Sequence, residues 1–197
     1  NYNIDLVLSF SEPISKPLIE YKKWLGMIDI YPSFSSYKIL YDKYILKKYL
    51  EKMRTKSFQI PRSFDLSYKV RFPCIVKPNI GWGAEYITIC NSYRELRKSL
   101  KRIELSGRKP IIEEYIPFED KLILNILIDK RYRIRRVTVR KGKNVEKIKN
   151  KISTIINELE SFFKSIKYFG FASPQFLVKG DKFYLTEINP RLSAIPF

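Results

Sequence analysis

The 197-residue sequence predicts a mixed α+β fold, and three observations support this class. Segments with strand alternation and segments with helical periodicity follow one another along the chain, without an internal repeat. Hydrophobic residues make up 45% of the chain and aromatic residues 15%, which supplies a sizeable core. The length suffices for one large domain or for two small ones that share a cleft.

The first 35 residues alternate between strand and helix. Short apolar runs at 4–10 and 27–31 predict strands, and the segment from Pro13 to Trp24 predicts a helix. Such alternation is typical of the edge of a parallel sheet. Because the stretch is too short for a complete domain, we expect the chain to begin inside one.

A helical unit follows. From Ser36 to Met53 apolar residues recur with helical spacing, and Ile60-Pro61 ends the unit. The predicted apolar face consists of Tyr37, Leu40, Tyr41, Tyr44 and Ile45.

The next segments predict a hairpin and a helix. Two strands, 70–78 and 85–90, flank a turn that contains glycine. Ser92 and Glu95 have the spacing of a capping box, which opens a helix that runs to Gly107. The apolar face of this helix consists of Leu96, Leu100 and Ile103.

The second half predicts five strands and one long helix. The strands are 111–116, 122–128, 133–140, 173–179 and 183–189, and Gly180-Asp181 joins the last two. Between them, isoleucine, leucine and phenylalanine recur on one helical face from Ile148 to Ile166.

The absence of histidine excludes Ser-His-Asp and Cys-His catalysis and the usual zinc sites. Catalysis must then rest on carboxylates, lysines, arginines, backbone amides and a hard metal. Cys74 and Cys90 lie in apolar runs and are predicted to be buried thiols in a reducing compartment. The sequence shows neither a membrane-spanning apolar run nor a signal peptide, and we expect a cytoplasmic location.

The formal net charge of +18 is concentrated in residues 121–151, where 12 Lys or Arg residues stand against Asp129 and Glu146. Such a stretch favours phosphate-bearing or acidic partners, among them nucleic acid, an acidic protein, an anionic membrane surface or a polyphosphate ligand. The alternative is a solvated basic face.

Two motifs are typical of nucleotide contacts. Lys77 ends an apolar strand, and Gly81 and Gly83 follow, so backbone amides can approach a phosphate closely. Glu113 and Glu114 end another strand, whose backbone can pair with an adenine edge, while a carboxylate can hold ribose hydroxyls. The alternatives are an ordinary hairpin with a surface lysine and a solvated acidic turn.

The closing hairpin carries the most informative motif. Strand alternation predicts that Leu185, Glu187 and Asn189 share one face, with Gln175 on the partner strand. Oxygen ligands at this spacing suit magnesium, and Arg191 lies just past the strand, within reach of a phosphate. The alternative is a polar edge strand.

Alternation between 133 and 140 places Arg136, Thr138 and Arg140 on one face and Arg133 and Arg135 on the other. An arginine here can stabilise charge on a transferred phosphoryl group, and Arg140 is the preferred candidate. The alternative is a basic exposed hairpin.

Taken in order, these segments resemble the ATP-grasp superfamily, and most of all its carbamoyl-phosphate-synthase-like carboxylate ligases. The resemblance covers residues 36–194 and rests on DKYILKKYL with IPRSF, FPCIVKPNIGWGAEYI, IIEEYIPFED and FASPQFLVKGDKFYLTEINPRLS. It implies two small α+β lobes with ATP between them. The lobes would span 36–107, with the phosphate-loop hairpin, and 108–197, with the adenine hinge and the metal-binding hairpin. Residues 1–35 would end a Rossmann-like domain that precedes the ATP-grasp fold.

The resemblance also implies a role for each candidate residue. ATP would be bound by Lys43, Lys77, Gly81, Gly83, Glu113, Glu114, Tyr115, Ile116 and, at the ribose, Glu119. Magnesium, or manganese in its place, would be bound by Gln175, Glu187 and Asn189, and the acyl phosphate would be steadied by Arg140 and Arg191.

The implied activity is an ATP-dependent ligase that activates a small carboxylate as an acyl phosphate for attack by an amine. Two departures from the family pattern stand out: Trp82 and Glu85 lie in the phosphate loop, and Ser193-Ala194-Ile195 follow the NPR motif. Glu85 would repel a phosphate if it pointed inward. The alternative function is a catalytically weak relative that binds nucleic acid or an acidic partner through 121–151.

Overall fold

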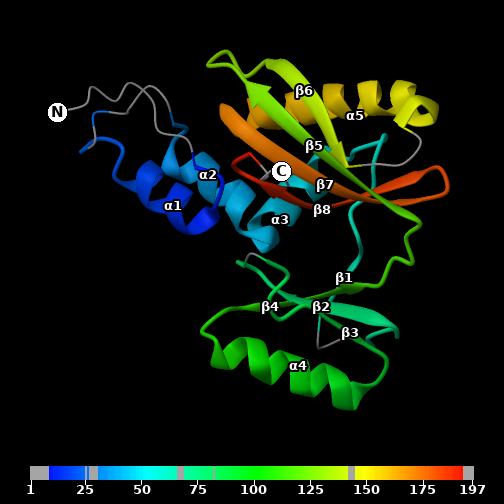
Figure 1. Ribbon diagram of the computed structural model, residues 1–197. Helices are drawn as coiled ribbons and strands as arrows, with labels where there is room; N and C mark the ends of the chain where they lie inside the picture. The colour runs from blue at the N-terminus through cyan, green and yellow to red at the C-terminus, as the bar shows by residue number, and fades with distance from the viewer. Residues whose placement is uncertain are drawn as a thin grey trace.

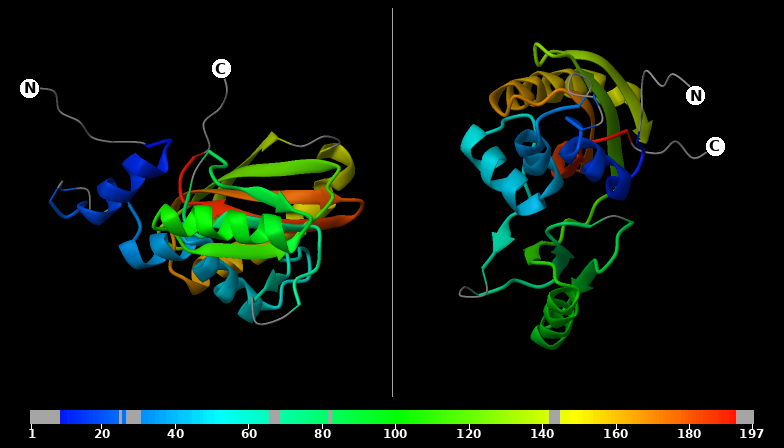
Figure 2. Two further views of the ribbon diagram at one scale, coloured as in Figure 1. Left: turned by 90° about the horizontal axis from the view of Figure 1, so that it is seen from below. Right: turned by 90° about the vertical axis from the view of Figure 1, so that its left-hand side faces the viewer.

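Two four-stranded antiparallel sheets organise the chain, and each packs one face against helices (Figure 1). The computed structural model describes residues 9–24, 26, 31–65, 69–81, 83–141 and 145–192. The first sheet lies below the second in the view of Figure 1, and the right view of Figure 2 shows the same two-part arrangement. The predicted class, two small α+β lobes, is confirmed.

The first sheet has the strand order β1-β4-β2-β3, and helix α4 covers one of its faces. The elements are β1 (Ser63–Phe64), β2 (Cys74–Pro78), β3 (Thr88–Cys90), α4 (Tyr93–Leu105) and β4 (Pro110–Glu114). Cys74 and Cys90 are direct partners in the β2–β3 ladder, and both thiols are buried against α4 as predicted. Burial raises the pKa of the Cys74 thiol to about 11, which keeps it protonated at neutral pH.

Helix α4 begins at the cap that the sequence predicts, with one difference. The Ser92 hydroxyl accepts a hydrogen bond from the Glu95 amide at 3.3 Å, as a capping box requires. The Glu95 carboxylate accepts from the amide of Asn91 at 2.7 Å, one residue before the expected donor.

The second sheet has the strand order β6-β5-β7-β8, and helix α5 packs on one face. The elements are β5 (Asp120–Ile128), β6 (Ile134–Lys141), α5 (Val145–Ser165), β7 (Gly170–Lys179) and β8 (Lys182–Asn189). The predicted hairpin at Gly180-Asp181 is confirmed, since Lys179 and Lys182 are the last pair of the β7–β8 ladder.

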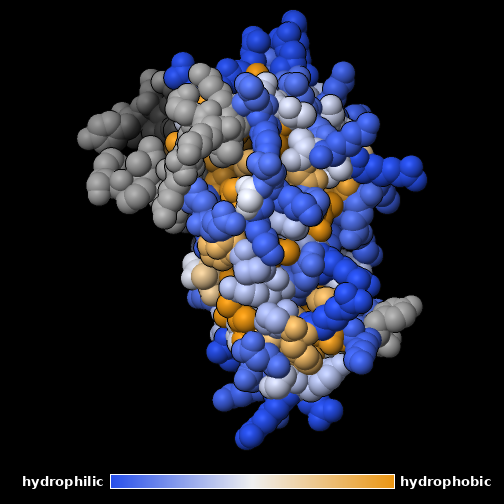
Figure 3. All heavy atoms as spheres, turned by 90° about the vertical axis from the view of Figure 1, so that its right-hand side faces the viewer, coloured by the Kyte–Doolittle hydropathy of each residue, from blue (hydrophilic) through white to orange (hydrophobic). Residues whose placement is uncertain are grey.

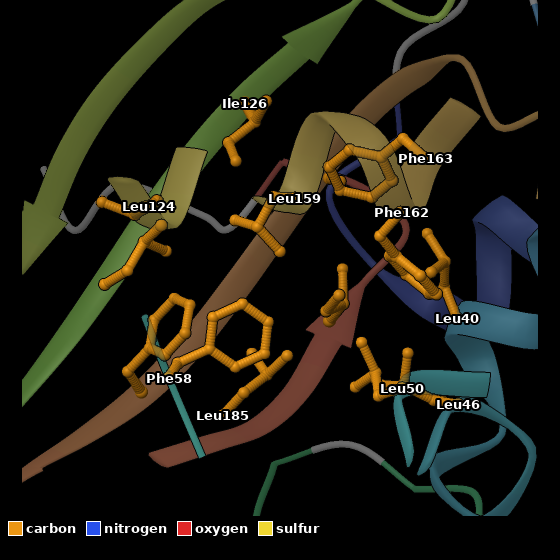
Figure 4. Close-up of a cluster of buried hydrophobic side chains, with 14 of the residues drawn as sticks. Leu40, Leu46, Leu50, Phe58, Leu124, Ile126, Leu159, Phe162, Phe163 and Leu185 are labelled. Atoms are coloured by element: carbon orange, nitrogen blue, oxygen red, sulfur yellow. The ribbon is translucent and has the colours of Figure 1, made fainter. Parts of the chain in front are cut away.

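The main core lies between this sheet and its helices (Figure 4). Leu159, Phe162 and Phe163 of α5 meet Leu124 and Ile126 of β5. Leu40, Leu46, Leu50 and Phe58 extend the same cluster at the β8 edge. The segment 40–58 therefore belongs to the core of the second sheet.

The single helix predicted from Ser36 to Met53 is in fact two, α2 (Phe34–Tyr41) and α3 (Lys43–Met53). Asp42 separates them with an extended backbone, and its carboxylate accepts hydrogen bonds from the Tyr44 and Ile45 amides. This cap restarts the helix in a new register, so Tyr44 is half exposed and does not share the buried face of Tyr37.

The predicted alternation of Leu185, Glu187 and Asn189 is wrong because β8 contains a β-bulge. Gln175 pairs with Glu187, but the next residue, Phe176, pairs with Leu185. Because Thr186 is an extra residue in β8, the side chains on its two sides no longer follow one alternation between the faces of the sheet. Leu185 consequently lies in the core, while Glu187 and Asn189 lie on the opposite face.

The sheets do not follow the expected division at 107 and 108. Strand β4 pairs with β1 and β2, so the first sheet continues to Glu114. The chain passes between the two sheets twice, in 54–62 and in 115–119. Of the N-terminal predictions, helix α1 (Glu12–Glu20) is present, whereas residues 1–8 and 27–30 lie outside the described part of the chain.

Leu159→Ala should lower the free energy of unfolding by about 2–5 kcal/mol, because the side chain is fully buried and its removal leaves a cavity. The matched control is Leu105→Ala, where the same atoms are removed from a side chain that is 79% exposed. Urea unfolding should show a change within about 0.5 kcal/mol for the control. Equal losses in the two variants would contradict the assignment of the core.

Candidate functional site

A cavity of about 760 Å³ lies between the two sheets, a volume typical of ligand sites. In Figure 3 apolar side chains are exposed between the hydrophilic upper and lower ends of the molecule. Twelve of the residues that the sequence assigns to the nucleotide, the metal or the acyl phosphate line this cavity, and they come from both lobes. They are Lys43, Lys77, Gly81, Gly83, Glu113, Glu114, Tyr115, Ile116, Gln175, Glu187, Asn189 and Arg191.

A buried ion cluster lies beside the cavity, and two of its members, Lys77 and Glu113, line it. Lys77 Nζ lies 2.7 Å from Glu113 Oε2, and Lys47 Nζ lies 3.3 Å from Glu113 Oε1. Burial acts to raise the pKa of Glu113, but the two ammonium groups outweigh it and hold that pKa below its ordinary value. Burial also lowers the pKa of Lys47, against the opposing effect of Glu113. The cluster has two cations for one anion.

Lys47 was missed by the sequence analysis, although a signal existed. It lies four residues after Lys43 on α3, and residues at this spacing share one helix face. Its ammonium group also donates to the carbonyl oxygen of Pro61.

Lys43 is fixed at the first turn of α3 by the residue that precedes it and by the end of β2. The Asp42 carboxylate accepts from Asn79 Nδ2 at 2.8 Å, and the Asn79 carbonyl accepts from the Lys43 amide at 2.9 Å. Lys43 Nζ lies 3.4 Å from Glu187 Oε2 and 3.4 Å from the carbonyl oxygen of Gly81. Lys43 thereby meets both the glycine-containing loop and β8.

The oxygen donors predicted for a metal converge on one point of the second sheet. Glu187 and Gln175 are cross-strand partners, and Asn189 Nδ2 donates to Glu187 Oε1 at 3.2 Å. Among the described residues, no group of three or more His, Cys, Asp or Glu side chains is placed to hold a metal. The donor set fits Mg²⁺ nevertheless, because this ion is usually held by one or two carboxylates together with phosphates and water.

The loop after β2 is held by arginines of the α4–β4 region. Glu85 Oε2 lies 3.0 Å from Arg108 Nη1, and the guanidinium groups of Arg102 and Arg108 lie over the Tyr86 ring, 5.3 and 5.4 Å from its centroid. Ala84 and Tyr86 have left-handed backbones, so the strand predicted from 85 begins only at Thr88. The Glu85 carboxylate is therefore at the rim of the cavity but already paired with a cation.

Apolar side chains that the sequence analysis did not single out complete the walls. Ile75 and Ile89 are cross-strand partners on the face of the first sheet that is opposite α4. Ile87, Phe118 and Leu177 join them around the cavity. Ile87 and Ile89 are more than 40% exposed, so a flat apolar ligand would find an uncovered surface here.

Some candidates are placed elsewhere. The Glu119 carboxylate accepts from the Gly180 amide at 3.2 Å, and Glu119 is not among the residues that line the cavity. The Glu114 amide already donates to the carbonyl oxygen of Arg62, which removes it as a donor to a ligand. The side chain of Arg140, together with Trp82 and residues 193–195, lies outside the described part of the chain.

Three basic residues of the stretch 121–151 form ion pairs, two with Asp129 inside the stretch and one with Asp181 outside it. Arg133 and Arg135 both contact Asp129, at 3.3 and 3.2 Å, and Lys151 lies 2.6 Å from Asp181. Binding of nucleic acid or an acidic protein by this stretch stays a prediction. Across the described ranges, no helix has the length and apolar character needed to cross a bilayer.

The sequence profile of the ATP-grasp domain matches residues 40–195. Two curated relatives are carbamoyl phosphate synthase large chains. That of Helicobacter pylori is 25% identical over 70% of this chain and 14% of its own length, and that of Thermotoga neapolitana is 24% identical over 87% and 18%. The chain thus spans less than a fifth of these relatives.

Solved structures share the fold. Biotin carboxylase from Campylobacter jejuni superposes with a TM-score of 0.73 at 17% identity, over 91% of this chain and 46% of that one. D-alanine–D-alanine ligase from Bacillus anthracis, in complex with ATP, superposes with a TM-score of 0.63 at 19% identity, over 88% and 62%.

Glu113→Gln should lower the free energy of unfolding at pH 7 by about 3–5 kcal/mol, because it leaves two buried ammonium groups without their carboxylate. The folded pKa of Glu113 lies below its ordinary 4.5, so its stabilisation is complete above that value and is lost as the pH falls through the folded pKa. Urea unfolding between pH 7 and pH 3 should therefore show the difference between variant and parent narrowing in acid. The exposed Glu104→Gln is the control, and a difference that does not depend on pH would contradict the ion cluster.

Proposed function

The chain belongs to the ATP-grasp family, and on that premise we propose that it is an ATP-dependent ligase. It binds Mg-ATP in the cavity between its sheets and activates a carboxylate as an acyl phosphate, which an amine or another nucleophile then attacks. The observation that carries the proposal is the meeting of Lys43, Lys77 and Glu187 in one cavity from opposite lobes.

The two ends of the cavity differ in polarity, as the phosphates and the base of a nucleotide require. One end has the ammonium groups of Lys43 and Lys77 beside the loop with Gly81 and Gly83, which suits a triphosphate. The other end has apolar walls, which suit a purine ring. Backbone groups of Tyr115 and Ile116, just past β4, are the positions that we assign to the adenine edge.

The metal would be held by Glu187 and Asn189, with Gln175 beside them. When bound, Mg²⁺ neutralises phosphate charge and orients the γ-phosphoryl group for in-line transfer. Lys43 Nζ lies 3.4 Å from Glu187 Oε2, so a cation on α3 holds this carboxylate in place.

In the proposed reaction an oxygen of the substrate carboxylate attacks the γ-phosphorus, and the bond from that phosphorus to the oxygen of ADP breaks. The nucleophile then attacks the acyl carbon, and phosphate leaves. Lys77, Lys43 and Arg191 supply positive charge where negative charge develops, and this role needs no histidine. Arg140 remains a candidate for the same task.

Mg-ATP should raise the melting temperature, because a ligand of the folded state adds about 2.7 kcal/mol of stability at a hundredfold excess over its dissociation constant. Lys77→Ala should abolish most of the rise, and Glu187→Ala should abolish the part that requires magnesium. The exposed Glu104→Ala is the control, and each variant is compared with itself without ligand. No rise in the folded parent protein would refute the nucleotide site.

The Glu85–Arg108 pair provides a separate test of phosphate placement. Arg108→Ala should weaken Mg-ATP binding by about two- to fivefold, because it leaves an uncompensated carboxylate at the rim of the cavity. Adding Glu85→Gln to that variant should restore binding, while Glu85→Gln alone should change it little. Calorimetric titration measures all four proteins, and a double variant as weak as Arg108→Ala would instead indicate that Arg108 itself contacts ATP.

A further inference from the structure

A second cavity, of about 460 Å³, adjoins the first and has different walls. It lies between α1 and the end of the second sheet, where β5 ends and β7 begins. Most of its surface is apolar, and the side chains that matter here are Ile19, Pro32, Leu127, Phe169 and Phe171. The function proposed above leaves this cavity without a role.

The sheet itself connects the two cavities. Leu127 of β5 and Phe171 of β7 are cross-strand partners, and Ile123 and Gln175 are partners nearer the other end of the same strands. Residues two apart on a strand share a face, so Phe171, Ser173 and Gln175 lie in one row. That row is polar at the first cavity and becomes apolar at the second.

Arg191 lies at the junction, since it lines both cavities. It follows β8 directly after Asn189 and Pro190, and its Nη1 donates to the carbonyl oxygen of Leu192 at 3.0 Å. The acidic residue at the second cavity, Asp129, is engaged by Arg133 and Arg135. The junction therefore favours an anion.

We propose that the second cavity binds an apolar side chain of the carboxylate substrate, whose carboxylate lies beside Arg191 and faces the first cavity. The inference rests on the proposed function and adds the substrate class, a monocarboxylic acid with an aliphatic or aromatic tail. A small acid such as acetate would leave Leu127, which is 37% exposed, and its neighbour Phe171 uncovered. Covering them removes apolar surface from water.

The test compares acetate, butyrate and hexanoate by ligand-observed NMR titration, with and without Mg-ADP. A fully buried methylene group is worth roughly fourfold in affinity, so we expect hexanoate to bind at least about tenfold more tightly than acetate. Equal affinity for the three acids would overturn the proposal.

Leu127→Asn should remove most of the chain-length preference and leave acetate binding unchanged. Leu105→Asn, the same change at an exposed position of the other lobe, should keep the preference. Arg191→Gln should weaken acetate and hexanoate alike. If Leu127→Asn still binds hexanoate more tightly than acetate, the placement of the tail in the second cavity is overturned. Cooperative thermal unfolding of the variant is the control that it is folded.

The titration of Mg-ADP alone separates the two proposals. If Mg-ADP binds and the acids show no chain-length preference, only the substrate class fails. If Mg-ADP does not bind but the preference persists and depends on Leu127, the second cavity stands and the ligase function fails.

Discussion

The carboxylate of Glu113 between the ammonium groups of Lys47 and Lys77 is the interaction on which the rest of the structure depends. Its members come from α3, β4 and β2, and Lys77 also donates to the carbonyl oxygen of Thr186 on β8. The cluster thus fixes strands of both sheets and the helix beside them. Of the two lysines, Lys77 lines the cavity, and its ammonium group places a positive charge there that suits a site for a phosphate.

Local patterns predicted most of the fold, because hairpin turns, helical faces and the cap at Ser92 are encoded by neighbouring residues. The predictions of secondary structure were wrong where one residue interrupts a periodic pattern. Asp42 is a good helix cap, yet it lies inside a continuous apolar periodicity that favours one helix. Thr186 is extra only with respect to β7, and no residue near it in the sequence indicates the bulge.

The site was predictable to the extent that its residues occur in recognisable strings. Lys77, Glu187 and Asn189 stand in such strings, and the structure brings them to one cavity. The apolar walls and the pairing of Glu85 with Arg108 were not predictable, since they arise from contacts between segments far apart in sequence. The hydrogen bond from the Glu114 amide to the carbonyl oxygen of Arg62 is a contact of the same kind, and it leaves Tyr115 and Ile116 as the positions that we propose for the adenine edge.

The two passages of the chain between the sheets have a mechanical consequence. A single connecting segment would let the lobes rotate about several axes. Two segments, 54–62 and 115–119, act together as a hinge and restrict that rotation. The segment 54–62 is fixed to the second sheet at Gln59. The Gln59 amide donates to the carbonyl oxygen of Phe183, and the Gln59 carbonyl oxygen accepts from the Leu185 amide. The relative motion of the lobes that the chain opposes least is then a rotation about the axis through these two segments. Such a rotation changes the width of the cleft while keeping each lobe's half of the site in line with the other.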